Sequence, residues 1–167
     1  MSESFDKAFE FLLKFEGGYT NDPKDPDGET KYGISKRAYP NLNIKDLTIA
    51  QVKNIYSRDY WTKIRGDELP PKIARVAFDF AVNAGVGTSI KSIQNLCGLK
   101  EDAVFGSKTL SAIIDRAEKK GELPVALDLL EIRLNYLISI VFKRNSSIIY
   151  LKGWTRRVFA LLKEVSQ

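Results

Sequence analysis

The sequence predicts a mainly α-helical fold with one long irregular loop near its start. Apolar residues recur at spacings of three and four along most of the chain, which is the period of a helix buried on one face. Glycines, prolines and capping residues separate these segments. Between residues 14 and 39 the pattern changes to Gly, Pro, Asp, Asn and Thr, which favours an irregular loop with room for a short hairpin.

The first predicted helix carries apolar residues at helical spacing from Phe5 to Leu13. Glu16 continues the same spacing, and Gly17-Gly18 ends the helix. A second begins at Thr48, where Thr-Ile-Ala-Gln has the pattern of a capping box, and runs towards Trp61. The later helices are expected at about 70–84, at 88 or 89–97, at 107–120, at 124–143, and over a final amphipathic segment around 154–165.

Length and composition are those of a soluble globular protein. The 167 residues suit one domain, or one domain with a small second lobe, and 44% are hydrophobic and 28% charged. No run of about 18 apolar residues occurs, so we expect no stable membrane insertion. Residues 1–6 lack the basic start and apolar run of a signal peptide. We therefore expect synthesis in the cytoplasm, with a separate route of release for any work outside it.

The types of residue present exclude several chemistries. The chain has no histidine and a single cysteine, Cys97. An internal disulfide, a zinc site and Ser–His or Cys–His catalysis are therefore ruled out, and we expect no metal and no cofactor. Carboxylates, tyrosines and lysines remain as acid–base groups.

The charge balance favours anionic partners in general. The net charge of +5 suits a nucleic acid, a membrane surface or an acidic cell wall. The 26 Lys and Arg residues are nearly balanced by 21 acids, and there is no long basic run. We therefore expect no nucleic-acid partner.

Glu16 is the strongest candidate for catalysis. It lies eleven residues after Phe5, which at about 100° per residue returns it to within roughly 20° of the same helix face. Burial on that face and the negative end of the helix dipole both favour a protonated carboxyl, which a general acid for glycosidic cleavage requires. The alternative is a partly exposed glutamate beside an ordinary glycine cap.

The loop that follows brings three aspartates within six residues: Asp22, Asp25 and Asp27. Prolines after the first two restrict where these carboxylates point. A second carboxylate is the usual other half of glycoside hydrolysis, as nucleophile or as base for water. An Asx-turn cluster or a calcium loop is the alternative, although the spacing does not match an EF-hand.

These motifs resemble the signature of glycoside hydrolase family 108. The resemblance rests on Phe15-Glu16-Gly17-Gly18-Tyr19, Asn21-Asp22-Pro23, Asp25-Pro26, Gly28, Thr30 and Gly33-Ile34-Ser35. Members of that family are N-acetylmuramidases of lysozyme-like fold, often encoded by phages and prophages, and some are described as secretion activators. The resemblance implies that Glu16 is the catalytic residue.

The resemblance continues along the chain. Residues 59–61, 69–70 and 78–85 resemble the family's central region, and residues 153–158 its C-terminal Gly-Trp-x-x-Arg-Val box. Residues 91–98 and 104–109 resemble a peptidoglycan-binding lobe. The implied division is a lysozyme-like catalytic part, 1–87, and a helical peptidoglycan-binding-like lobe, 88–167, packed into the same globule. Asp27 and Ser107 depart from the family pattern, where glycine and proline are usual.

A looser similarity to phage lysozymes bears on the second catalytic group. Their Glu–Asp–Thr triad has eight and then five intervening residues, and here eight separate Glu16 from Asp25 and four separate Asp25 from Thr30. Asp25 is therefore preferred to Asp22 as the second carboxylate, with Thr30 holding or orienting water. Asp22 is kept as a residue for binding substrate.

Four further side chains are candidates for binding substrate. Tyr19 and Tyr32 are expected to line the sugar groove, although both could be simple loop tyrosines. Asn83, on an otherwise apolar helix, is expected to hold an N-acetyl group. Gln94 is a candidate contact for the stem peptide, which helix capping and packing explain equally well.

The resemblance thus implies a monomeric muramidase of the endolysin type, which cuts the β-1,4 bond between N-acetylmuramic acid and N-acetylglucosamine. Its partner would be bacterial peptidoglycan, reached after release from the host cytoplasm by a holin or exporter, with lysis of the bacterium as the result. The alternative is a non-catalytic peptidoglycan-binding or secretion-assisting protein of the same fold.

Overall fold

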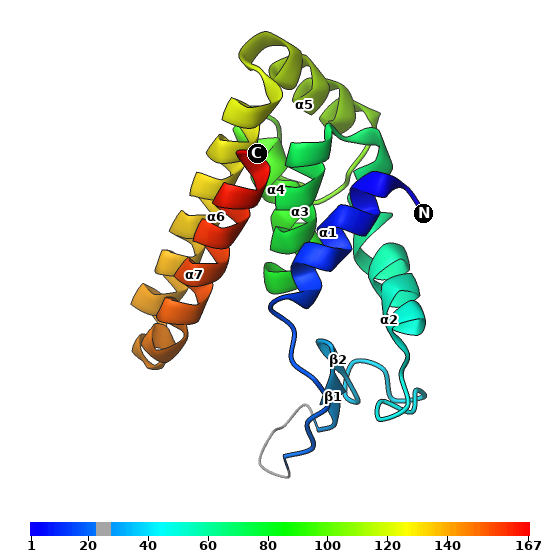
Figure 1. Ribbon diagram of the computed structural model, residues 1–167. Coiled ribbons are helices and arrows are strands. Elements are labelled where there is room, and N and C mark those ends of the chain that lie inside the picture. The colour runs from blue at the N-terminus through cyan, green and yellow to red at the C-terminus, as the bar shows by residue number, and fades with distance from the viewer. Residues whose placement is uncertain (23–27) are drawn as a thin grey trace.

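The computed structural model describes residues 1–22 and 28–167 and confirms a mainly α fold. Seven α-helices and one small hairpin make up most of the described chain (Figure 1). The α-helices are α1 (Glu3–Leu13), α2 (Ile49–Tyr56), α3 (Pro71–Ala84), α4 (Val86–Leu96), α5 (Ser107–Lys120), α6 (Glu122–Lys143) and α7 (Ile148–Val165). The strands β1 (Thr30–Lys31) and β2 (Ile34–Ser35) form the hairpin, and η1 (Ser57–Trp61), η2 (Gly66–Glu68) and η3 (Asn145–Ser147) are short helical turns.

Local sequence rules explain where several helices begin. Thr48 caps α2, and its capping box with Gln51 is complete, as predicted. Pro71 occupies the first turn of α3, where its missing N–H costs nothing. The start predicted for α4 at residue 88 or 89 is wrong, because Gly85 caps the helix and Ser89 Oγ donates instead to Ala77 O at 2.8 Å.

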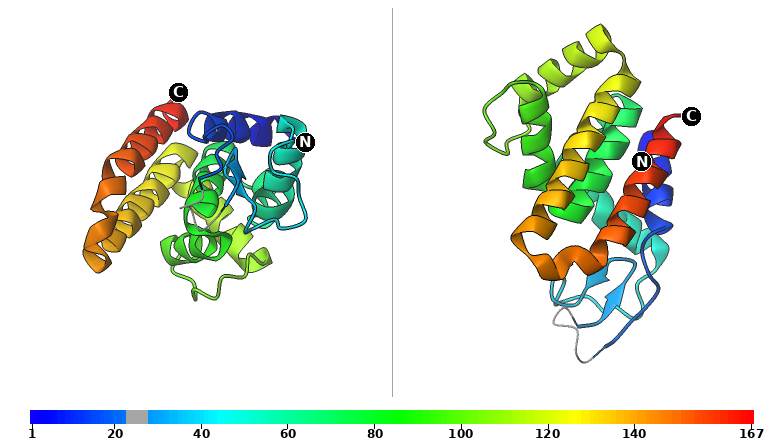
Figure 2. Two further views of the ribbon diagram at one scale, coloured as in Figure 1. Left: turned by 90° about the horizontal axis from the view of Figure 1, so that it is seen from below. Right: turned by 90° about the vertical axis from the view of Figure 1, so that its left-hand side faces the viewer.

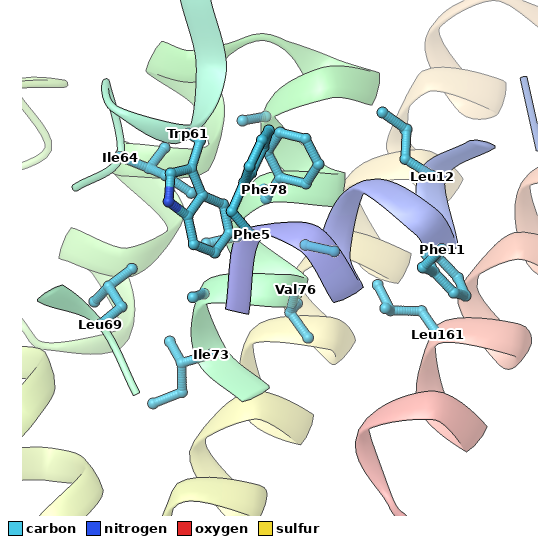
Figure 3. Close-up of a cluster of buried hydrophobic side chains, with 14 of the residues drawn as sticks. Phe5, Phe11, Leu12, Trp61, Ile64, Leu69, Ile73, Val76, Phe78 and Leu161 are labelled. Carbon is cyan, nitrogen blue, oxygen red and sulfur yellow. The ribbon is translucent and has the colours of Figure 1, made fainter. Parts of the chain in front are cut away.

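A cluster of aromatic side chains forms the centre of the core. Phe5 of α1, Trp61 of η1 and Phe78 of α3 pack with ring centres 5.3 to 5.8 Å apart (Figure 3). Trp61 is thus in the core, and its indole N–H donates to Asp67 Oδ1 at 2.8 Å. Leu161 of α7 is buried in the same hydrophobic cluster. The core therefore combines residues from both parts of the chain, while the division of roles between 1–87 and 88–167 stays a prediction.

The long helices α6 and α7 run side by side in opposite directions and pack against each other (Figures 1 and 2). Both also pack on α3. Charged side chains in the middle of α6 and α7 can therefore reach the buried side of α3. In the described residues, no helix is both long and apolar enough to cross a membrane.

The hairpin lies beyond the C-terminal end of α1, at the lower end of the molecule in Figure 1. β1 and β2 are antiparallel, with Thr30 opposite Ser35 and Lys31 opposite Ile34. Thr20 adds a bridge to Thr30 on the other side, with two backbone hydrogen bonds of 2.8 and 2.9 Å. The short hairpin anticipated in the irregular segment is therefore present, and it folds back towards the end of α1.

Candidate active site

Glu16 lies in the turn after α1, three residues beyond the last helical residue, Leu13. The N–H groups of Lys14 and Phe15 donate to carbonyls three residues back, at 3.1 and 2.9 Å, which tightens and closes the helix. The helix predicted to reach Glu16 is therefore shorter than expected. The Glu16 side chain is 16% exposed, so its carboxyl is mostly buried but still accessible from solvent.

The turn of the hairpin packs directly against the Glu16 carboxyl. Tyr32 and Gly33 form this turn with φ of 50° and 76°, values that a two-residue hairpin needs. A Cβ on Gly33 would lie 2.6 Å from Glu16 Oε2 and even closer to the Tyr56 hydroxyl. Tyr56 donates to Tyr32 O at 3.0 Å, and Tyr32 N–H donates to Gly17 O at 3.0 Å. The hairpin is therefore fixed against the carboxyl by contacts on both sides.

Tyr56 forms one side of this part of the site, and the core holds its ring in place. Its side chain is 2% exposed and packs against Phe9 and Phe78. Burial, and then the negative charge of Glu16, raise the pKa of the Tyr56 hydroxyl, so it stays protonated and acts as a donor.

We expect Gly33→Ala to reduce the hydrolysis of cell walls strongly, and to lower the temperature of thermal unfolding to a lesser extent. The new methyl group would collide with Tyr56, which the core holds in place, and with the Glu16 carboxyl, which must therefore move. A positive φ for alanine adds about 1–2 kcal/mol of strain. Hydrolysis of cell walls and thermal unfolding, measured on the same preparation, separate the two effects.

Gly28→Ala is the matched control for this substitution. Gly28 has a similar φ of 69°, but the atom nearest to a methyl group added there would be Lys36 Cβ at 3.7 Å, an ordinary contact. The control therefore carries the backbone strain without the collision. Equal losses of activity in both variants would contradict a special role for the close approach of Gly33 to Glu16.

Arg157 of α7 joins Glu16 to a buried charge network. Its Nη1 donates to Glu16 Oε1 at 3.1 Å. Its Nε and Nη2 both donate to Asp79 Oδ1 of α3, at 3.0 and 2.8 Å. The second oxygen of Asp79 is paired with Arg133 of α6. Two carboxylates and two guanidiniums from four separate segments therefore form one connected group.

The network is almost entirely removed from water. Asp79 is 1% exposed and Arg133 is fully buried. Burial lowers the pKa of Arg133, and attraction to Asp79 offsets part of that effect. Burial also acts to lower the pKa of Arg157, but the charges of Asp79 and Glu16 outweigh it and raise that pKa. Because buried charges must be paired, both arginines depend on Asp79.

A groove with a volume of about 450 Å³ is lined by Arg157, the ion-pair partner of Glu16, and by Phe15, its neighbour in the chain. We call it the groove beside Glu16, although Glu16 itself is not among its lining residues. Phe15 forms part of its lining, and Arg157 lies over the Phe15 ring with Cζ 5.4 Å from the ring centre. The lining residues are Lys14, Phe15, Asn83, Gly153, Trp154, Arg156 and Arg157. Aromatic rings, an amide and several cations therefore line a space that Arg157 connects to Glu16, which suits a polar ligand that bears sugar rings and negative charge.

A second hollow, of about 480 Å³, lies beside α2. Its lining is mostly apolar and includes Tyr39, Leu42 and Ile55. Neither Glu16 nor its partner Arg157 lines this hollow, whereas Arg157 lines the groove beside Glu16. The groove is therefore the better candidate, although its volume is slightly smaller.

The structure describes three of the four remaining candidates in the N-terminal loop, and they lie in different positions. Tyr19 is 38% exposed and donates from its hydroxyl to Glu29 Oε1 at 2.8 Å. Asp22 is exposed, and Thr30 lies in β1. Asp25, the preferred second carboxylate, lies outside the described residues.

Asn83 and Gln94 are in different environments. Asn83 is exposed at the end of α3, lines the groove beside Glu16 and accepts from Arg133 Nη2 at 3.2 Å. Gln94 is 2% exposed, and its Nε2 donates to Asp102 Oδ1 at 2.7 Å and to Val104 O at 3.0 Å. Its Oε1 accepts from Ala103 N–H at 3.1 Å. Gln94 therefore secures the loop after α4 and is not among the residues that line the groove.

Three residues that build the site were not selected as site residues from the sequence: Gly33, Asp79 and Arg157. Asp79 is a charged residue on an otherwise apolar helix, a pattern that requires buried partners but does not say which they are. No sequence pattern identifies Arg157 as the residue that contacts both Asp79 and Glu16. Among residues 1–22 and 28–167, no three side chains of His, Cys, Asp or Glu are grouped as metal ligands.

Two comparisons with known proteins found a match, one to the first half of the chain and one to nearly all of it. The family model described as Glycosyl hydrolase 108 matches residues 9–85, a range that includes Glu16, the hairpin and Asn83. The solved structure of Brucella abortus SagA is similar, with a TM-score of 0.80 and 32% sequence identity. That similarity covers 97% of this chain and 93% of that one. No curated protein matches the sequence.

Proposed function

This chain belongs to the glycosyl hydrolase 108 family, and from that membership we propose that it is a muramidase. In this proposal it hydrolyses the β-1,4 bond between N-acetylmuramic acid and N-acetylglucosamine in bacterial peptidoglycan. One observation carries the proposal: a mostly buried carboxyl, Glu16, is held by the hairpin turn and by Arg157, and Arg157 also lines a groove with aromatic, amide and cationic groups.

Glu16 acts as the general acid in this proposal. Arg157 gives it one N–H, to Oε1, while the Nε and Nη2 donors go to Asp79. In this proposal Oε2, the oxygen that Arg157 does not contact and that faces the hairpin turn, delivers a proton to the glycosidic oxygen as the bond to the anomeric carbon breaks. General acid catalysis of this kind contributes roughly 10²–10⁴ in rate.

Water completes the reaction by adding to the anomeric carbon. A second carboxylate, Asp25 in preference to Asp22, acts either as the nucleophile or as the base that takes the proton from the water, and Thr30 holds or orients the water. Tyr19 and Tyr32 contact sugar rings, and Asn83 holds an N-acetyl group. Gln94 is left out of this proposed site, because both ends of its amide are bonded within the protein.

Incubation with purified insoluble peptidoglycan tests whether the protein cleaves or only binds. We expect the protein to release new reducing ends and to lower the turbidity of the suspension. Sedimentation of the protein with the insoluble material, without new reducing ends, would instead favour a non-catalytic peptidoglycan-binding or secretion-assisting protein.

A further inference from the structure

The C-terminal region contains a long stretch without acidic residues. Between Glu131 and Glu164 the chain has seven Lys and Arg residues and no Asp or Glu. Arg133 and Arg157 belong to the buried network. The other five are exposed and form no ion pair with any residue in the described ranges. These five are Lys143, Arg144, Lys152, Arg156 and Lys163.

Large apolar side chains are exposed at one end of this stretch. We call residues 142–152, where α6 ends, η3 turns and α7 begins, the basic tip. Phe142 is 86% exposed, Ile149 73%, Tyr150 57% and Ile148 55%. Lys143, Arg144 and Lys152 lie among them. Exposed apolar groups are ordinary when scattered, but a cluster of them marks a surface that binds something.

The basic tip projects from the body of the molecule. It forms the lower-left end of the α6–α7 pair in Figure 1, well away from α5, and both views of Figure 2 show it at the far end of that pair. None of its residues belongs to the buried hydrophobic core. Its most exposed apolar side chains, Phe142 and Ile149, are therefore available to bind a partner.

We propose that the basic tip docks on the surface of an anionic phospholipid membrane, where Phe142, Ile148, Ile149 and Tyr150 enter the interface and Lys143, Arg144 and Lys152 contact lipid phosphates. Apolar and aromatic side chains combined with several cations are the features of surface-bound segments. Each cation near an anionic leaflet adds to the attraction, which salt screens. The short apolar segment lies on the membrane and does not span it, which agrees with the absence of a spanning helix in the described residues.

Charge argues against a second copy of the chain as the occupant of this surface. Two tips brought together would place Lys143, Arg144 and Lys152 of one copy against the same cations of the other, without an acid in residues 132–163 to pair them. An anionic lipid surface instead matches both the apolar and the cationic groups.

The basic tip adjoins the groove beside Glu16. Tyr150 of the tip stacks on Trp154, with ring centres 5.8 Å apart, and Trp154 lines that groove. Docking at the tip would therefore hold the groove close to the membrane surface. Binding to lipid does not require cleavage of peptidoglycan, so the two proposals fail separately.

Sedimentation with lipid vesicles tests the proposal. We expect the protein to sediment with vesicles of phosphatidylcholine and phosphatidylglycerol, but not with phosphatidylcholine alone, and to dissociate as salt is raised. Reversing the charge at Lys143→Glu and Arg144→Glu together should weaken binding roughly tenfold or more. Phe142→Ser with Ile149→Ser should also weaken it, because two exposed anchors are lost.

The matched control is Lys91→Glu with Lys119→Glu, two exposed lysines outside the tip. Either charge-reversal pair changes the net charge by −4, from +5 to +1, so the control separates the tip from overall charge.

An equal loss of binding in the control pair would overturn the proposal, as would no binding by the wild-type protein. A tip-dependent dimer in light scattering, without vesicle binding, would also overturn it. Unchanged thermal unfolding and unchanged cleavage of lipid-free peptidoglycan would show that the tip variants are folded.

Discussion

Glu16→Gln is expected to reduce the release of reducing ends from peptidoglycan by roughly 10²–10⁴-fold. Glutamine keeps the size of the side chain and an oxygen that can accept from Arg157, but it cannot deliver a proton to the glycosidic oxygen. Thermal unfolding should therefore change little while activity is nearly lost. Binding to insoluble peptidoglycan should persist, because the groove itself is unchanged.

Glu10→Gln is the matched control, since Glu10 is an exposed residue on α1 and the chemical change is the same. It should leave activity at the wild-type level. Full activity of Glu16→Gln would remove Glu16 from the role of general acid. A large fall in unfolding temperature would show instead that the carboxylate is needed mainly to balance the charge of Arg157.

Asp79→Asn is expected to cause the largest loss of stability of the substitutions considered. It removes the negative charge that both Arg133 and Arg157 share, and leaves two buried guanidiniums with only Glu16 in partial compensation. Removing one partner of a buried ion pair costs about 3–5 kcal/mol. For a domain of this size that corresponds to a fall in unfolding temperature of roughly 10 °C. Activity should fall too, because Arg157 no longer holds Glu16 firmly.

Asp128→Asn provides the comparison. Asp128 also faces two cations, Arg116 at 3.2 Å and Lys120 at 3.6 Å, but its side chain is 37% exposed. Surface pairs of this kind contribute about 0–1 kcal/mol. Similar effects of the two substitutions, measured by thermal or denaturant unfolding, would contradict the importance given to burial of the Asp79 network.

The sequence was sufficient to predict features set by short segments. The capping box at Thr48 and the start of α3 at Pro71 both depend on residues that are neighbours in the chain. The end of α1 was less predictable, because Gly17-Gly18 indicated a later stop, whereas the backbone closed the helix with short-range hydrogen bonds at Lys14 and Phe15.

The environment of Glu16 could not be predicted in the same way. Arg157 is 141 residues away in the chain from Glu16 and 78 from Asp79. Charged residues in apolar helices indicated that partners must exist, but only the packing of α3, α6 and α7 determines which partners they are. The close approach of Gly33 to the carboxyl likewise depends on how the hairpin folds back towards α1.

The identity of the new reducing end in digested peptidoglycan tests the central claim most directly. Purified peptidoglycan would be digested with the wild-type protein and with Glu16→Gln, and the soluble fragments would be analysed by mass spectrometry. We predict fragments that end in N-acetylmuramic acid, formed by the wild-type protein and nearly absent with the variant. Fragments that end in N-acetylglucosamine, or equal amounts of product from both proteins, would contradict the assignment of a muramidase with Glu16 as its acid.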